Sequence, residues 1–176
     1  MDWMKIKSVC RISLILVCSV LAVSSCSISY KFNGASINYD KIKSITIENF
    51  SNRSALVWGP MTPKLNTAIK DIYAQQTRLK LVNRGGDLQL GGEITGYEQS
   101  TKSIAADGYT SMNSLKLTVN VRFTNNTNHT EDFEQQFSAT RDFDSKKQLT
   151  SVQEELVDQM IKEIVDQIFN TTVANW

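Results

Sequence analysis

The stretch that decides the fold reads Leu115-Lys-Leu-Thr-Val-Asn-Val-Arg-Phe-Thr124. Apolar and polar side chains alternate through all of it, so every second side chain faces the same way. This alternation is typical of a strand in an antiparallel sheet with one buried and one solvated face. A turn-forming run, Asn125-Asn-Thr-Asn-His129, follows. The chain then returns through Phe133–Phe143 with four apolar residues on one parity: Phe133, Phe137, Ala139 and Phe143. The pattern predicts a long hairpin with one apolar face.

The last part of the chain predicts a helix that covers this apolar face. Ser151-Val-Gln-Glu154 matches a capping box, in which two side chains satisfy the first free N–H groups of a helix. Two rows of apolar side chains follow at helical spacing: Val152, Leu156, Met160, Ile164 and Ile168, and beside them Val157, Ile161 and Val165. Because two rows make a wide apolar arc, we expect this helix to lie across the hairpin.

Shorter elements are expected in the first half of the domain. Lys43–Glu48 alternates isoleucines with polar residues and predicts a strand. Thr62-Pro63 predicts a helix start, with a hydroxyl at the N-cap and proline at the first helical position. Two more strands are expected at Leu79–Val82 and Leu88–Tyr97, and a polar loop over Gln99–Asn113. Gly91-Gly92 indicates a bulge or a close approach of another backbone.

In order, these elements predict an α/β protein of the α+β kind. We expect a two-layer sandwich in which a mixed sheet of four to five strands carries two helices on one face and stays polar on the other. The loop Asn49–Met61 is apolar for a loop, because it contains Phe50, Leu56, Val57 and Trp58. These side chains either pack on the core or form a contact surface for a partner.

The N-terminus resembles the export signal of a bacterial lipoprotein. Three basic residues precede an uncharged run at 12–23, which is well short of the roughly 20 residues that a spanning helix needs. Val23-Ser24-Ser25-Cys26 then resembles a lipobox. The resemblance implies cleavage before Cys26, a diacylglycerol on its sulfur, and acylation of its new amino group. The alternative is an uncleaved membrane anchor.

The expected organisation is a signal peptide at 1–25, a lipidated tether at 26–40 and one domain at 41–176. Within the tether, Ile28, Tyr30 and Phe32 alternate with polar residues, which indicates either an edge strand or a solvated linker. Three acyl chains on Cys26 would make the membrane attachment effectively permanent.

Charge and cysteine content exclude several classes of protein. Without the leader the chain carries 16 basic and 17 acidic residues, so broad attachment to nucleic acid or anionic membranes is excluded and any anion site must be a local cluster. Only Cys26 remains, so no internal disulfide can form. The single histidine, His129, lies in the predicted turn, which supports neither a nucleophile–histidine pair nor a zinc site. We expect no catalytic residue, no metal and no cofactor besides the covalent lipid.

Several segments along the chain carry a family resemblance: Cys26–Ser36, Ile45–Phe50 with 63–77, Asp87-Leu-Gln-Leu-Gly-Gly-Glu-Ile94, Leu117–Val121 and Glu154–Val165. Taken together, they resemble the LPS-assembly lipoprotein family, LptE, in its shorter form. The resemblance implies an outer-membrane lipoprotein that plugs the large β-barrel LptD, assists assembly of that barrel and helps deliver lipopolysaccharide to the outer leaflet. It implies no catalysis. The domain is expected inside the barrel lumen or facing the periplasm.

The resemblance also implies lipopolysaccharide binding through basic residues at loop ends. The candidates are Lys146 and Lys147, before the last helix, and Lys102, before the hairpin. Their ammonium groups would pair with lipid A phosphates, and the alternative for each is an ordinary solvated charge. The second functional hypothesis is an independent envelope lipoprotein of similar fold that scaffolds or regulates a periplasmic enzyme, such as a cell-wall synthase. A plug should depend on its barrel for abundance and co-purify with it in detergent, whereas a regulator should be extracted from the membrane without a barrel.

Overall fold

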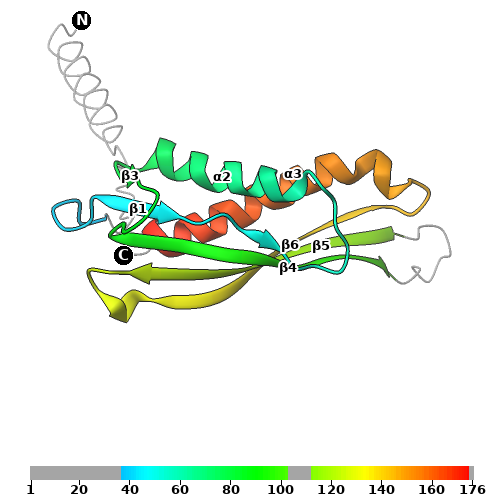
Figure 1. Cartoon of the computed structure of the whole chain (residues 1–176). Coiled ribbons are helices and arrows are strands. Elements are labelled where there is room, and N and C mark those ends of the chain that lie inside the picture. The colour runs from blue at the N-terminus through cyan, green and yellow to red at the C-terminus, as the bar shows by residue number, and fades with distance from the viewer. Residues whose placement is uncertain (1–36, 103–111, 175–176) are drawn as a thin grey trace, which may run out of the picture. The chain divides into compact units, whose positions relative to one another are not determined.

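The computed structural model describes residues 37–102 and 112–174, which form a two-layer α+β domain (Figure 1). Its strands are β1 (Ser44–Ile47), β2 (Ser51–Asn52), β3 (Lys80–Leu81), β4 (Leu88–Lys102), β5 (Met112–Asn125) and β6 (Phe133–Asp144). The helices are α2 (Met61–Gln76) and α3 (Leu149–Phe169), and α3 continues into a π-helical turn, Asn170–Ala174. Both helices lie on the same side of the sheet (Figure 1).

The sheet is mixed, with the order β3-β1-β4-β5-β6. β1 pairs in parallel with β3 and β4, and β2 continues along the same edge of β4. The three long strands β4, β5 and β6 pair antiparallel as a meander. The predicted mixed sheet with two helices on one face is confirmed. It has six strands rather than four or five among the described residues, because the two-residue β2 pairs separately from β1.

The inner face of β5 carries the alternation that the sequence shows. Leu115, Leu117, Val119, Val121 and Phe123 are all buried, whereas Lys116 and Arg122 of the opposite face are exposed. α3 covers the meander with fully buried side chains such as Met160 and Ile164, whereas Ile161 and Val165 of its second row lie toward α2. The core is therefore a single layer of side chains between the meander and the helices.

Gly92 of β4 shows the close backbone approach that the glycine pair indicates. A Cβ at this position would lie 2.2 Å from the carbonyl oxygen of Asn120 and 2.6 Å from Cε1 of Phe50. The only register shift between β4 and β5 lies at Ile94/Gly96, beyond the glycine pair. Gly92 is therefore a site of close backbone approach and not of a bulge. The irregularity of the β4–β5 ladder lies around Thr95.

Both predicted helix starts are wrong in detail. α2 begins at Met61 after Pro60, so Thr62 and Pro63 already lie in its first turn. α3 begins at Leu149, and the hydroxyl of Ser151 donates to the carbonyl oxygen of Gln148 at 2.7 Å instead of capping the helix. The turn after β6, closed by the bond from Lys147 N to Asp144 O at 2.9 Å, brings the chain into the helix early.

Two loops also differ from expectation. β4 and β5 extend into the predicted loop Gln99–Asn113, because their ladder continues to the pair Lys102↔Met112. In the loop after β1, Phe50 is buried and its backbone N–H and carbonyl bond to the side chain of Asn66 at 2.7 and 3.2 Å. Trp58 packs against the core, whereas Leu56 and Val57 are exposed. Phe50 and Trp58 therefore fit the interpretation that the loop packs on the core, whereas Leu56 and Val57 fit the interpretation of a contact surface.

The leader, Cys26 and the tether up to residue 36 lie outside the described residues. From residue 37 the chain packs on the domain, because Ile37 and Ile42 are buried in the core. Asp87 holds the start of β1 in place by accepting bonds from Lys43 N at 2.8 Å and from Ser44 N at 3.0 Å. Within 37–102 and 112–174, neither helix is long and apolar enough to cross a membrane.

Replacing Gly92 by alanine tests the close approach. Gly92→Ala should lower the free energy of unfolding by about 1–3 kcal/mol, because the new methyl group overpacks against backbone. Gly59→Ala is the matched control, since nothing lies within 4 Å of a Cβ there, and it should change stability by less than about 0.5 kcal/mol. Urea unfolding followed by circular dichroism measures both. Equal midpoints for the two variants would contradict the packing at Gly92.

Candidate functional site

The three predicted lysines gather at one end of the sheet. Lys102 is the last residue of β4, opposite Met112, and Met112 in turn pairs with Asp144 at the end of β6. Lys146 and Lys147 follow in the turn between β6 and α3. Lys102 therefore belongs to a strand, not to the loop where the sequence placed it. We call Lys102, Lys146 and Lys147 the lysine end.

Lys102 is already engaged within the domain. Its Nζ lies 2.6 Å from Oδ2 of Asp142, the outward residue two positions before the end of β6. This hydrogen bond, helped by one from Ser114 and by the charge of Lys102, lowers the pKa of the Asp142 carboxyl below its ordinary value. Lys102 therefore fastens the two outer strands of the meander together, and its charge is largely compensated.

Lys146 and Lys147 differ from Lys102 in their side-chain contacts. Both are exposed, and neither side chain forms an ion pair or hydrogen bond with a described residue. α3 begins directly after them without an acidic residue in its first turn, so its N-terminal N–H groups add positive potential. The part of the lysine end that can receive an anion is therefore the turn between β6 and α3.

The lysine end is remote from the point where the chain enters the domain. The backbone N–H of Lys43 donates to the carboxylate of Asp87, the residue directly before β4. The point where the chain enters the domain therefore lies beside the start of that strand. β4 has 15 residues and places its two ends about 45 Å apart. In Figure 1 the entry side carries the labels β1 and β3, and the opposite side is where yellow β6 passes into orange α3.

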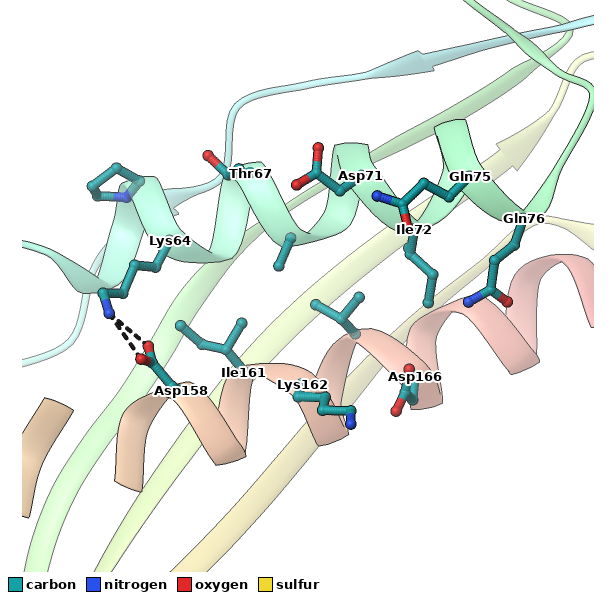
Figure 2. Close-up of a pocket in the computed structure, with 13 residues that line it drawn as sticks. Lys64, Thr67, Asp71, Ile72, Gln75, Gln76, Asp158, Ile161, Lys162 and Asp166 are labelled. Atoms are coloured by element: carbon teal, nitrogen blue, oxygen red, sulfur yellow. Dashed lines mark hydrogen bonds and ion pairs between the residues drawn. The ribbon is translucent and has the colours of Figure 1, made fainter. Parts of the chain in front are cut away.

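A groove between the two helices was not predicted. It has a volume of about 610 Å³ and opens on the side of the helix layer away from the sheet (Figure 2). Ile72 reaches from α2 toward α3 and Ile161 from α3 toward α2, at different positions along the groove, and Thr67 and Asp166 belong to its polar rim (Figure 2). The sequence holds no signal for this groove, because its two walls are about ninety positions apart and their pairing is tertiary.

Lys64 closes one end of the groove. Its Nζ lies 2.8 Å from Asp158 and 3.0 Å from Glu154, so it joins the first turn of α2 to the first half of α3. Hydrogen bonds to Asp158 and then Glu154 raise the pKa of Lys64. The ring of Trp58 lies 5.7 Å from the same ammonium group, which ties the loop after β2 to this corner.

The polar clusters of the domain are arranged for structure. His129 Nδ1 lies 2.9 Å from Asp132 Oδ2 in the exposed turn between β5 and β6. The nearby hydroxyls of Thr127 and Thr130 bond to asparagine side chains of that turn at 2.7 Å. Among residues 37–102 and 112–174, no group of three His, Cys, Asp or Glu side chains is placed to hold a metal ion.

The engagement of Lys102 can be measured directly. Lys102→Met should return the pKa of the Asp142 carboxyl toward its ordinary value, because the hydrogen bond that favours the carboxylate is lost. In the native protein the pair persists as pH falls and breaks only when Asp142 is protonated, below its ordinary pKa. Carboxyl NMR titration reports both values. Lys147→Met is the control and should leave Asp142 unchanged; an unchanged titration in Lys102→Met would contradict the pair.

Solved structures resemble this fold at low sequence identity. The uncharacterized lipoprotein B from Nitrosomonas europaea matches with a TM-score of 0.54 and 17% identity over 76% of this chain and 83% of its own. Rare lipoprotein B from Shewanella oneidensis matches with a TM-score of 0.52 and 18% identity over 72% of this chain and 92% of its own. A minor lipoprotein from Acinetobacter baumannii matches with a TM-score of 0.51 and 16% identity over 76% of this chain and 94% of its own. At these identities the likeness concerns the fold alone.

The sequence itself matches a family model. No curated protein matches the chain. The model described as "LptE: Lipopolysaccharide-assembly" matches residues 42–172, which run from two residues before β1 into the π-helical turn after α3. This match covers well over half of the chain and agrees with the fold of the lipoproteins above. The protein therefore belongs to the LptE family of lipopolysaccharide-assembly proteins.

Proposed function

We propose that the protein is the lipid-anchored subunit of the outer-membrane lipopolysaccharide translocon. In this role it fills the lumen of an LptD-type barrel, assists assembly of that barrel and contacts lipopolysaccharide without catalysing a bond change. The observation that carries the proposal is the family match, which spans almost all of the described domain. Lipopolysaccharide assembly is the general role of the family; the barrel partner and the direct lipid contact are the parts proposed here.

The outer face of the sheet supports the plug. It is polar along its length, and its charges are compensated across strands, as in Arg53–Glu93 at 3.2 Å and Arg122–Glu134 at 3.6 Å. Asn120 of β5 also donates to Glu134 of β6 at 2.6 Å. A polar face with paired charges suits the water-filled interior of a large barrel, where an apolar face would remain unpartnered.

The separation of the two ends supports a transmembrane position within the barrel. A lipid on Cys26 would hold the entry side near one leaflet. The lysine end lies about 45 Å away along β4, which exceeds the roughly 30 Å of a bilayer's hydrocarbon core. A domain held upright in the lumen would thus present Lys146 and Lys147 on the far side of the membrane from its anchor.

The state of the lysines supports separate roles at the lipopolysaccharide contact. Lys146 and Lys147 would pair with lipid A phosphates as exposed point charges. Lys102 would act by holding Asp142, because a carboxylate released from this pair would repel an incoming phosphate. We therefore assign direct contact to Lys146 and Lys147 and a positioning role to Lys102.

A mild-detergent pull-down of tagged protein from native membranes tests the complex. We expect a stoichiometric outer-membrane barrel to co-purify, identified by mass spectrometry. Cys26→Ala should abolish incorporation of a lipid label and reduce the recovered barrel, because the anchor that places the domain is missing. Recovery of a cell-wall enzyme instead of a barrel would overturn the proposal in favour of the regulator. An unchanged lipid label in Cys26→Ala would end the assignment of the anchor.

Charge reversal at the lysine end tests the lipid contact. The double change Lys146→Glu and Lys147→Glu should weaken binding of purified lipopolysaccharide at least about tenfold at low salt, because two attractive contacts become repulsive. Lys70→Glu with Lys162→Glu, on the helix layer, is the control of equal charge and should bind as the native protein does. Circular dichroism verifies that both variants are folded. Native binding by the Lys146/Lys147 variant would remove these residues from the site.

A further inference from the structure

The entry side of the domain carries a second basic cluster, remote from the lysine end. It is formed by two separate segments, one leading into β1 and one from the end of α2 to the turn before β4. The basic residues are Lys41, Lys43, Arg78, Lys80 and Arg84, and all five are exposed. We call them the entry patch. Their assembly on one side is notable because the mature chain is nearly neutral overall.

Backbone pairing holds the two segments of the patch together. β1 and β3 run in parallel with Ser44 opposite Lys80, and Lys80 N donates to Lys43 O at 2.9 Å. The guanidinium of Arg78 lies 5.6 Å from the centre of the Tyr39 ring, and its backbone N donates to the Tyr39 hydroxyl at 3.4 Å. The basic side chains therefore project from ordered backbone at the edge of the sheet.

The positive charge of the entry patch is only partly compensated within the described domain, by Asp87 beside Lys43 and by Glu48 in the hollow that Arg84 lines. None of its five side chains forms an ion pair with a residue in 37–102 or 112–174. The Asp87 carboxylate interacts with the charge of Lys43, and its Oδ2 atom accepts bonds from Lys43 N, Ser44 N and the Ser44 hydroxyl, so it offsets one of the five positive charges. Asp40 is the one exposed acid within the segment that leads into β1. The cluster thus retains a net positive charge.

Acidic residues of the neighbouring turn are engaged elsewhere. Glu131 and Asp132 lie between β5 and β6, on the other half of the sheet. The two carboxylate oxygens of Glu131 accept bonds from the amides of Asn125 and Asn128 at 2.5 Å each. Asp132 accepts from Asn125 N at 2.7 Å and faces His129. These acids stabilise their own turn and leave the β1–β3 side basic.

An exposed apolar side chain lies within the entry patch. Leu81 of β3 is 41% exposed, and it follows Lys80 directly on the short edge strand. A basic cluster around a leucine is the combination that binds the surface of an anionic bilayer, because the charges meet the headgroups while the apolar group enters the interface. A polar protein partner would gain nothing from covering Leu81.

We propose that the entry patch rests on anionic phospholipid headgroups of the leaflet that holds the lipid anchor. This inference rests on the lipidation of Cys26 in the proposed function. Only ten residues, 27–36, separate that cysteine from Ile37, so the point where the chain enters the domain lies within about 40 Å of the anchor even for a fully extended chain. The contact orients the domain, with Lys146 and Lys147 pointing away from the leaflet.

The test places a reporter at Leu81 in the lipidated protein. Cys26 is blocked by lipid, so Leu81→Cys introduces the only free thiol of the mature chain, and a polarity-sensitive fluorophore is attached there. The protein is reconstituted into phosphatidylcholine vesicles with or without phosphatidylglycerol. We expect a blue-shifted emission only in the anionic vesicles, reversed by high salt because the attraction is electrostatic.

Two variants of equal net charge distinguish an effect of the entry patch from an effect of the protein's net charge. Changing Lys41, Lys43 and Lys80 to Gln should abolish the blue shift, since each basic residue removed weakens surface association about fivefold. Changing Lys146, Lys147 and Lys162 to Gln alters the net charge equally and should leave the shift intact. Equal emission in both vesicle types, or an equal loss in both variants, would overturn the proposal.

Flotation of the same vesicles reports the anchor independently. Protein that floats with neutral vesicles without an emission change in anionic ones would keep the lipid anchor and overturn the entry patch. Protein that fails to float with neutral vesicles but shifts its emission with anionic vesicles would keep the patch and overturn the anchor. Failure in both assays would overturn both.

Discussion

Burial of the inner face of β5 is the constraint on which the rest of the structure depends. Its five alternating apolar side chains, from Leu115 to Phe123, are buried, and each contributes about 1.5–3 kcal/mol relative to exposure. α3 packs over the meander, and α2 lies beside it, joined through Lys64. Because both helices occupy one face, the other is left polar along the whole meander. The same packing sets the length of the sheet and so the separation of its ends.

That separation gives a nearly neutral chain two independent basic regions. The lysine end and the entry patch lie about 45 Å apart along β4, several times the roughly 8 Å over which salt screens charge under physiological conditions. Each can therefore meet its own anionic partner without influencing the other. On the sheet between them, Arg53 pairs with Glu93 and Arg122 pairs with Glu134. The distribution of charge, not its sum, characterises this domain.

Local patterns predicted the elements well and their ends less well. The alternation at 115–124 and the apolar rows of α3 are properties of neighbouring residues, so the strand, the helix and their buried faces could be read directly. Ser151 and Thr62 looked like caps but lie inside their helices, because the preceding turns begin each helix earlier. Gln99–Lys102 has no apolar pattern and is a strand only because β5 pairs with it.

The sequence by itself determined the two-layer class, the hairpin and the covering helix, because periodic burial is written into short stretches. It indicated the family through the resemblance of several segments to known members. Only the tertiary structure decided which charges act together. Lys102 meets Asp142 forty positions away, and Lys43 meets Lys80 through the parallel pairing of β1 with β3. The groove between α2 and α3 likewise joins walls about ninety positions apart. Such contacts follow from strand order and helix packing, which short-range periodicity does not encode.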